Sequence, residues 1–223
     1  AFQPHEQGGF SRYRLVRPDQ VRPLPPGVST KHGALAEPFG VALHAVKRAG
    51  DVTGRSVLVT GAGPIGALAV AAAKARGASH VHASDPSESA LRVARAMGAD
   101  TVIRTGHDPL PEDVDVVIEA SGSRHAISSV LPVVRRGGVV VQVGNLPNAE
   151  IGVALGQLGT REIDYRGSYR FVDEITEAIA LMDGTVDVTP LMTHEYDIDD
   201  ARDAFDVAAD PTSGSSKVML RLG

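Results

Sequence analysis

Residues 56–66 read SVLVTGAGPIG, and this stretch decides the fold of the chain. A short apolar run rich in β-branched residues leads directly into a glycine cluster, which predicts a buried strand, a tight turn and the start of a helix. Gly61, Gly63 and Gly66 have the G-x-G-x-x-G spacing. In such a turn the first glycine permits the bend, the second lets a diphosphate approach the backbone, and the third lets the helix pack closely on the strand.

The sequence after the glycine turn strengthens this interpretation. The alanine-rich stretch 67–77 predicts a helix, whose positive N-terminal end would face an anion above the turn. A second strand, residues 80–84, follows and ends at Asp85, 19 residues after Gly66. A carboxylate at this place can accept hydrogen bonds from the ribose diol of an adenosine. The alternative is a glycine-rich turn beside a solvated aspartate, but the order of strand, turn, helix, strand and acid favours a dinucleotide site.

Composition limits the class of protein. The chain has 223 residues, 43% of them hydrophobic, which is enough for a sizeable core. Its net charge of −5 argues against a nucleic acid or an anionic membrane as partner. Cysteine is absent, which excludes disulfides and cysteine-based zinc sites within this chain and fits a cytoplasmic location. Because the chain begins on Ala1, we expect that an upstream portion is missing.

The strand and helix pattern continues beyond Asp85 and predicts an α/β fold with a doubly wound, parallel, six-stranded sheet in the order 3-2-1-4-5-6. The further strands are expected at residues 101–104, 114–120, 139–144 and 162–167, with helices at 87–98 and 124–136, the second of them ended by Gly137 and Gly138. Ligands of such sheets bind beyond the carboxyl ends of the strands. Here those ends are residues 61–63, Asp85, Ser121 and residues 143–145.

The two ends of the chain depart from this alternation. Residues 8–16 form a plausible strand, and residues 31–50 read as a helix whose true start Pro38 should mark. The last segment is expected to contain a helix at 171–183, an extended stretch at 189–193, a helix at 198–208 and a strand at 217–222.

Four motifs occur in order over nearly the whole chain: LAEPFGVALHAV at 35–46, VLVTGAGPIG at 57–66, the second strand ending at Asp85, and GSYRF at 167–171. Together they resemble the zinc-dependent medium-chain dehydrogenase/reductase family, and within it the polyol branch of sorbitol and L-idonate 5-dehydrogenases. The resemblance implies a Rossmann domain at residues 31–184, with remnants of a GroES-like catalytic domain at 1–30 and 185–223.

The resemblance also implies roles for individual residues. Glu37 matches the acidic residue at the catalytic zinc, and Arg170 matches an arginine near the substrate. The remaining matches concern the cofactor: Val41 packs on the nicotinamide ring, Gly63, Pro64 and Ile65 meet the diphosphate, Ser121 lies on the cofactor side, and Val143 and Gly144 meet the nicotinamide amide. Asp85 would bind the adenosine ribose and favour NAD over NADP, although Ala90 replaces a basic residue that family members often have.

Two of these residues, Glu37 and Arg170, also have a purely structural explanation. A glutamate in the first turn of a helix, such as Glu37, is favoured by the helix dipole alone, and Arg170 is equally well a surface residue at a junction. His44 on an apolar helix face is more often a satisfied core residue than a ligand. In the resembling family the zinc takes a Cys and a His from the upstream part, so we expect this chain alone to be inactive.

The leading prediction is therefore the nucleotide-binding portion of an NAD-dependent, zinc-type dehydrogenase that oxidises a secondary alcohol of a polyol or sugar acid, such as L-idonate, to a ketone. The alternatives are an inactive NAD(H)-binding module, a zinc-independent reductase of the same family, and a methyltransferase, which needs the glycine pattern less. The edge of the sixth strand is expected to pair two chains into a homodimer or within a homotetramer, with Ile163 and Tyr165 on one face of the joined sheet.

Overall fold

A computed structural model describes residues 8–223, and they form two compact units. The larger unit is Leu24–Leu191, and the smaller one combines the described part of residues 1–23 with Met192–Gly223. The sequence analysis placed these divisions at 30/31 and 184/185, and the assignment of the smaller unit to a GroES-like domain stays a prediction. Each unit is described by itself.

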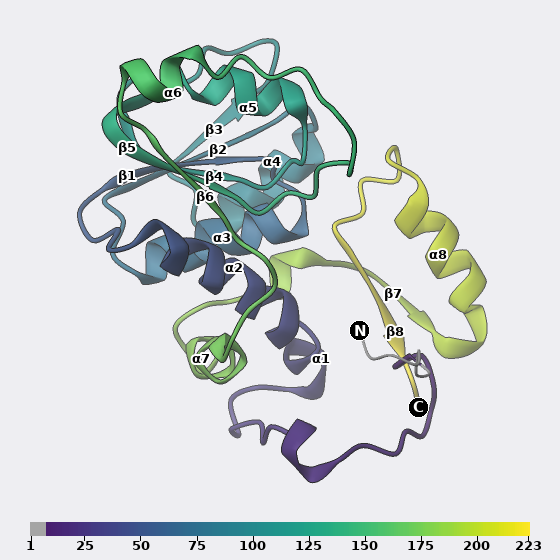
Figure 1. The fold of residues 1–223 in the computed structure, drawn as a ribbon. Coiled ribbons are helices and arrows are strands. Elements are labelled where there is room, and N and C mark those ends of the chain that lie inside the picture. The colour runs from purple at the N-terminus through teal and green to yellow at the C-terminus, as the bar shows by residue number, and fades with distance from the viewer. Residues whose placement is uncertain (1–7) are drawn as a thin grey trace. The chain divides into compact units, whose positions relative to one another are not determined.

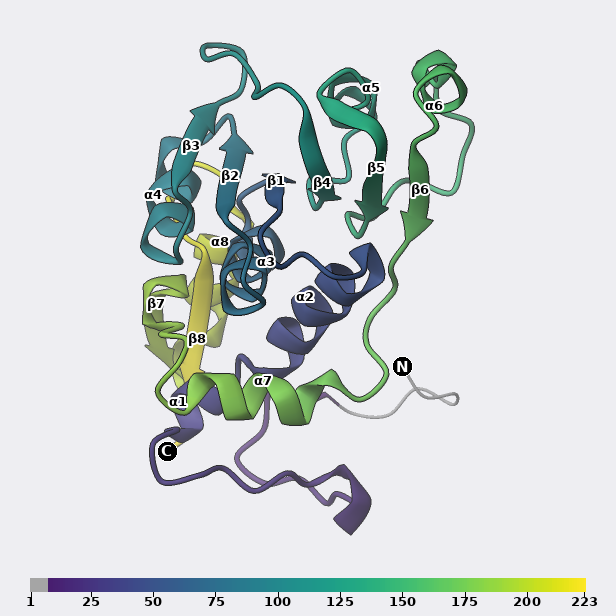
Figure 2. The same ribbon diagram turned by 90° about the vertical axis from the view of Figure 1, so that its left-hand side faces the viewer.

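The larger unit is built on a six-stranded parallel sheet in the order β3-β2-β1-β4-β5-β6, which confirms the predicted fold class and strand order (Figure 2). The strands are β1 (Ser56–Thr60), β2 (His80–Asp85), β3 (Thr101–Arg104), β4 (Val114–Glu119), β5 (Val134–Gln142) and β6 (Asp164–Gly167). The central strands β1 and β4 are almost wholly buried, as the continuous apolar runs of a sheet covered on both faces require.

Helices cover both faces of this sheet. Figure 1 shows α5 (Arg124–Val130) and α6 (Gly156–Thr160) on one side, and α2 (Ala36–Ala49) and α3 (Pro64–Ala75) on the other. The remaining helices of the unit are α1 (Thr30–Gly33), α4 (Glu88–Ala96), α7 (Glu174–Met182) and the 3₁₀ turn η2 (Thr189–Leu191). Pro38 is the third residue of α2 and does not mark its start. In the first turn the missing N–H of a proline costs no helix hydrogen bond.

The largest error of the sequence analysis concerns the boundary between α5 and β5. The helix was expected to run to residue 136, but it ends at Val130, and β5 begins at Val134, which is buried and pairs with Val114. Gly137 has a φ of +65°, and the pairing register of β4 and β5 shifts between Val114 and Val116. The two glycines therefore mark an irregularity inside a strand, not the end of a helix.

The sixth strand is also shorter than expected. It begins at Asp164, because Glu162 has a φ of +53° and the Ile163 N–H donates to the Leu158 carbonyl oxygen at 3.0 Å. The Ile163 side chain is buried in the core, whereas Tyr165 is 37% exposed. Ile163 therefore lies outside β6, and its position on one face of a joined sheet with Tyr165 stays a prediction.

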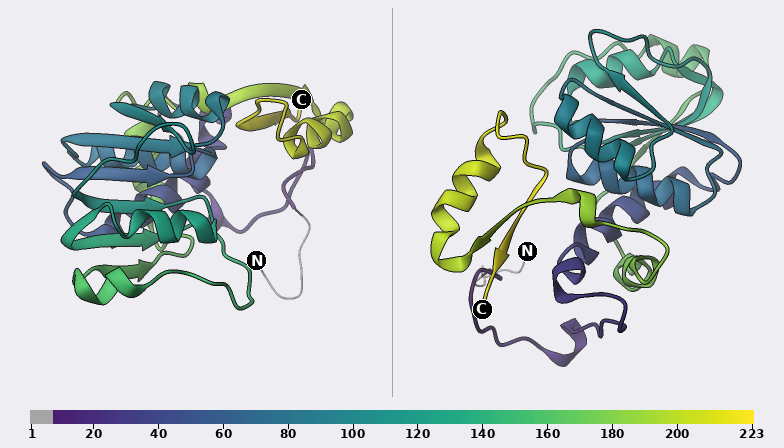
Figure 3. Two further views of the ribbon diagram at one scale, coloured as in Figure 1. Left: turned by 90° about the horizontal axis from the view of Figure 1, so that it is seen from above. Right: turned by 180° about the vertical axis from the view of Figure 1, so that it is seen from behind.

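The smaller unit contains a two-stranded parallel sheet of β7 (Met192–Asp197) and β8 (Lys217–Arg221), with α8 (Ala201–Ala209) packed beside it (Figure 3). Two 3₁₀ turns, η1 (Pro18–Gln20) and η3 (Ile198–Asp200), complete its elements. The strand expected at residues 8–16 does not form, and the expected extended stretch 189–193 is instead η2 followed by the start of β7.

A buried carboxylate fixes α7 against α2. Glu174 is 1% exposed, and it accepts hydrogen bonds from the His44 ring at 3.0 Å, the Lys47 ammonium at 3.1 Å and the Val172 N–H at 2.7 Å. Burial alone would raise the pKa of this carboxyl, but these donors outweigh it and hold the pKa well below its ordinary value. His44 is thus a satisfied packing residue, as the sequence analysis favoured.

We expect Glu174→Gln to lower the free energy of unfolding by about 2 to 3 kcal/mol at neutral pH, because a charge-assisted network is lost. A carboxyl with a lowered folded-state pKa stabilises the fold above its unfolded pKa of about 4.3 and loses that contribution as the pH falls further. The difference in free energy of unfolding between wild type and variant should therefore shrink from pH 6 to pH 3, as measured by urea titrations followed by circular dichroism. The exposed Glu150→Gln is the control, and a gap independent of pH would contradict the assignment.

Candidate functional site

The three glycines of the turn meet different surroundings. Gly61 follows β1 with a φ of +84°, and a β-carbon there would lie 2.6 Å from the Ser121 nitrogen. A β-carbon on Gly66 would overlap the Gly61 carbonyl oxygen. Around Gly63, at the N-terminal cap of α3, nothing lies within 4 Å of the β-carbon position. The first and third glycines are therefore required by the chain itself, whereas the second leaves open space at a helix N-terminus.

Asp85, at the end of β2, ties the glycine turn to the start of α4. One of its carboxylate oxygens accepts the Ala62 N–H at 2.8 Å, and the other accepts the Ser87 N–H at 2.8 Å. Ser87 in turn caps α4 through its side chain. A carboxylate has about four acceptor positions, so Asp85 retains acceptor capacity for a further partner while it holds these two segments.

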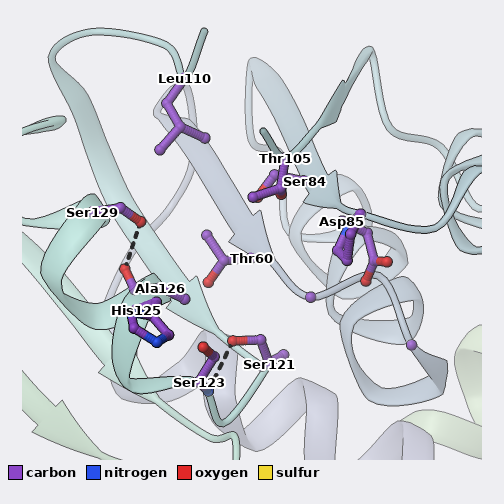
Figure 4. A pocket seen from close by; sticks show the side chains of 14 residues that line it. Thr60, Ser84, Asp85, Thr105, Leu110, Ser121, Ser123, His125, Ala126 and Ser129 are labelled. Carbon is purple, nitrogen blue, oxygen red and sulfur yellow. Dashed lines mark hydrogen bonds between the residues drawn. The ribbon is translucent and has the colours of Figure 1, made fainter. Parts of the chain in front are cut away.

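One cleft opens directly at this turn and has a volume of about 580 Å³ (Figure 4). We call it the turn cleft. It brings together the predicted residues Gly61, Gly63, Asp85 and Ser121. Its other lining residues are Thr60, Ser84, Pro86, Thr105, Leu110, Ala120, Ser123, His125, Ala126 and Ser129. Thr60, Ser84 and Ala120 lie at the last positions of β1, β2 and β4 or directly after them, so the cleft lies at the carboxyl ends of the strands.

A second cleft, of about 440 Å³, is called the Glu37 cleft. It brings together six predicted residues: Glu37, Val41, Ile65, Val143, Gly144 and Arg170. Its other lining residues are Ala120, Asn145, Ser168 and Tyr169. Ala120, directly after β4, lines both clefts, so they adjoin at the point where the strand order reverses. Pro64 and Gly66 line neither cleft and shape the first turn of α3.

Arg170 has an unusual backbone conformation. Its φ is +52°, a value that non-glycine residues rarely adopt, and its guanidinium carbon lies 5.2 Å from the centre of the Tyr169 ring. Non-glycine residues in this region are found most often in turns and functional sites. The side chain is exposed at the rim of the Glu37 cleft.

Sequence analysis missed the residue that organises this edge of the sheet. Glu119 is the last residue of β4 and is fully buried. Its carboxylate accepts from the Ser121 N–H at 2.8 Å, the Gly122 N–H at 3.2 Å, the Ser121 hydroxyl and the Gln142 amide. The signal was a second acidic residue, after Asp115, at the carboxyl end of the apolar run VDVVIEA, which was interpreted only as a buried strand.

The other missed residues gave no comparable signal. Ser123 at the N-terminal cap of α5, His125 in its first turn and Ser129 near its end line the turn cleft. Isolated serines and a lone histidine in a helix do not distinguish a cleft from a solvated surface, and only the tertiary fold brings them opposite the glycine turn.

The side chains present do not fit a catalytic zinc on their own. Such a site needs about three protein ligands, and Glu37 is the one carboxylate or imidazole that lines the Glu37 cleft. Within residues 8–223, no group of three or more His, Asp or Glu side chains is arranged to hold a metal ion. No helix in that same range is long and apolar enough to span a bilayer.

The larger unit has a Rossmann-type α/β fold with two adjoining clefts at the carboxyl ends of its strands. Residues 64–184 match the family model described as zinc-binding dehydrogenase, and the chain belongs to this family. This confirms the resemblance stated from the sequence motifs.

Individual relatives cover almost all of this chain. It is 37% identical over 224 residues to the L-idonate 5-dehydrogenase (NAD(P)(+)) of Escherichia coli strain K12, covering 97% of this chain and 65% of that protein. Sorbitol dehydrogenase of Bos taurus is 34% identical over 218 residues, covering 92% and 61%. The crystal structure of L-idonate 5-dehydrogenase from Escherichia coli K-12 superimposes with a TM-score of 0.92 at 35% identity, covering 98% of this chain and 65% of that one. The chain thus spans less than two thirds of these relatives.

Proposed function

We propose that this chain is the nucleotide-binding portion of an NAD-dependent, zinc-type dehydrogenase that oxidises a secondary alcohol of a polyol or sugar acid, such as L-idonate, to a ketone. The observation that carries the proposal is the pair of adjoining clefts at the carboxyl ends of the strands, because they unite ten residues chosen from sequence alone. The relatives named above act, by their names, on L-idonate and sorbitol.

The fit to a dinucleotide is argued from the clefts. The open space at Gly63, with Pro64 and Ile65 in the first turn of α3, suits a diphosphate at a helix N-terminus. Asp85 has acceptor capacity left for a ribose diol. Bound nicotinamide would supply the hydride acceptor of the reaction.

The Glu37 cleft suits the reactive end of the same ligand. Val41 and Ile65 offer apolar contact for a ring, and the backbone carbonyl oxygens of Val143 and Gly144 offer acceptors for its amide, because the N–H groups of both residues already donate to the Glu119 carbonyl oxygen. Glu37 and Arg170 are the charged residues that line this cleft, and we assign them to the substrate side, with Glu37 contributing to a zinc site completed by residues outside this chain.

A second candidate is an NAD(H)-binding module without catalysis, which the single metal-ligating side chain of the Glu37 cleft favours. A zinc-independent reductase of the same family is distinguished from both by activity without metal. All three assignments fit a cytoplasmic protein, and we propose that location.

The first prediction concerns the choice of cofactor. We expect the chain to bind NADH at least about tenfold more tightly than NADPH, because the Asp85 carboxylate would repel a 2′-phosphate. Calorimetry with both cofactors measures this difference. Equal affinities would refute the role of Asp85, and the absence of NADH binding would refute the proposed function.

Gly63→Ala is the matched variant for this measurement. It meets no atom of the chain, so the free energy of unfolding should change little while NADH affinity falls about tenfold or more through contact with the diphosphate. Gly61→Ala is the contrasting control, since a β-carbon there meets the Ser121 backbone and should lower stability itself.

The second prediction concerns catalysis. We expect the 223-residue chain to bind less than one zinc ion per chain and to show no alcohol oxidation, because the Glu37 cleft supplies a single potential ligand. Metal analysis after dialysis against zinc, with an NADH-formation assay on a panel of polyols and sugar acids, tests both points. Turnover with stoichiometric zinc would show that no further residues are needed.

Assembly through β6 is the third prediction. The Ser168 N–H bonds to Gln142 on β5, so the N–H groups of Tyr165 and Gly167 face outward from the edge strand. We propose that two such edges pair in a homodimer, which a homotetramer would contain as well. A substitution at Ile163 does not test this pairing, because the Ile163 N–H is bonded within the chain.

Gly167→Pro removes one outward donor, and a β-carbon at this position meets no neighbouring atom, so the variant should shift a dimer towards monomer in analytical ultracentrifugation. Gly167→Ala keeps the donor and should behave as the wild type. An unchanged dimer in Gly167→Pro would place the interface elsewhere.

A further inference from the structure

The Glu119 carboxylate is surrounded by hydrogen-bond donors. A carboxylate only accepts hydrogen bonds, and this one is 0% exposed, so every neighbouring polar group must present a donor to it. The donors are two backbone N–H groups and a hydroxyl of residues 121 and 122 on one side and the Gln142 amide nitrogen on the other. The Thr60 hydroxyl on β1 also donates towards the Glu119 carboxylate, with 3.5 Å between the two oxygens.

This requirement fixes the orientation of the Gln142 amide. Its nitrogen faces two acceptors, the Glu119 carboxylate and the Gly144 carbonyl oxygen at 2.7 Å. The amide oxygen is thereby turned towards β6, where it accepts the Tyr165 hydroxyl at 2.6 Å. Rotating the amide by half a turn would place its oxygen against a carboxylate. The direction of donation therefore runs from Tyr165 through Gln142 to Glu119.

Glu119 and Gln142 bond directly to the backbone that lines the two clefts, and Tyr165 bonds to Gln142. The Val143 and Gly144 N–H groups donate to the Glu119 carbonyl oxygen at 2.9 and 2.8 Å, while Gln142 holds the Gly144 carbonyl. A β-carbon on Gly144 would lie 2.9 Å from the Glu119 carboxylate, so this approach requires glycine. Ser121 lines the turn cleft and donates directly to the Glu119 carboxylate, whereas Gly144 lines the Glu37 cleft and is linked to that carboxylate through the Gln142 amide.

We propose that Glu119, Gln142 and Tyr165 are positioning residues that set the backbone at residues 121–122 and 143–144 for the dinucleotide, so that the edge strand influences cofactor affinity. The proposal rests on the proposed function. Tyr165 lines neither cleft, so its influence would pass through Gln142. Burial and the nearby Glu119 carboxylate raise the pKa of the Tyr165 hydroxyl, which keeps it a donor over the neutral pH range.

Tyr165→Phe is the central test, because it removes only the hydroxyl. We expect NADH affinity in calorimetry to fall about fivefold, the effect of one lost hydrogen bond. Without nucleotide, the Val143 and Gly144 amides should exchange with deuterium faster than in the wild type, relative to amides of β1. Tyr13→Phe, which alters a hydroxyl on a ring that is 93% exposed, should change neither quantity.

A double-mutant cycle with Glu119→Gln tests the relay itself. In that background the Gln142 amide is free to turn, so removing the Tyr165 hydroxyl should cost clearly less than it does in the wild type. Equal costs would overturn the relay, and so would a Tyr165→Phe variant with unchanged affinity and exchange. If Glu119→Gln does not fold, the Tyr165→Phe measurements still decide.

The outcomes separate this inference from the proposed function. A wild type that binds NADH, together with a Tyr165→Phe variant that binds it equally well, refutes the positioning role alone. A wild type that binds no NADH refutes the proposed function, and the positioning role for cofactor falls with it. Loss of global stability in urea without a change in affinity or local exchange would reduce Tyr165 to a structural residue and overturn the inference.

Discussion

The backbone of Gly61 lies so close to that of Ser121 that no β-carbon fits between them. This contact joins the ends of the two central strands, β1 and β4, at the point where the strand order reverses. Because the chain leaves β1 towards one face of the sheet and β4 towards the other, the space above this contact stays open. Both clefts adjoin there, and they are lined by all the cofactor residues inferred from the sequence except Pro64 and Gly66.

The predictable part of the fold came from patterns that are local in sequence. Buried parallel strands appear as continuous apolar runs, and a glycine turn followed by an acid 19 residues later needs no tertiary information. The errors arose where tertiary packing decides. Gly137 and Gly138 end helices in most sequences, but Val134 before them is drawn into the core and extends β5. Ile163 likewise enters the core instead of the edge strand.

The candidate site shows the same division. Residues at strand ends, such as Asp85 and Ser121, can be assigned to the site from the sheet topology. Glu37 and Arg170 were assigned to it only from family motifs, because no local pattern gives a surface charge a role. The role of Glu119 was overlooked because it depends on hydrogen bonds to Ser121, Gly122 and Gln142, which are 2, 3 and 23 residues away in the sequence. These groups meet only in the folded sheet. Long-range hydrogen-bond geometry is the information that a single sequence does not display.

The two fully buried glutamates of the larger unit solve the cost of burial in different ways. Glu174 is surrounded by a histidine and a lysine besides backbone N–H groups, an arrangement that serves to fasten one helix to another. The side-chain and backbone donors to Glu119 are all neutral: amide N–H groups and hydroxyls. A buried charge that is balanced only by dipoles is stable if each dipole is held in place. The residues that carry these dipoles therefore lose conformational freedom. That rigidity lies at the junction of the two clefts, where a dinucleotide site gains most from a backbone already set in position.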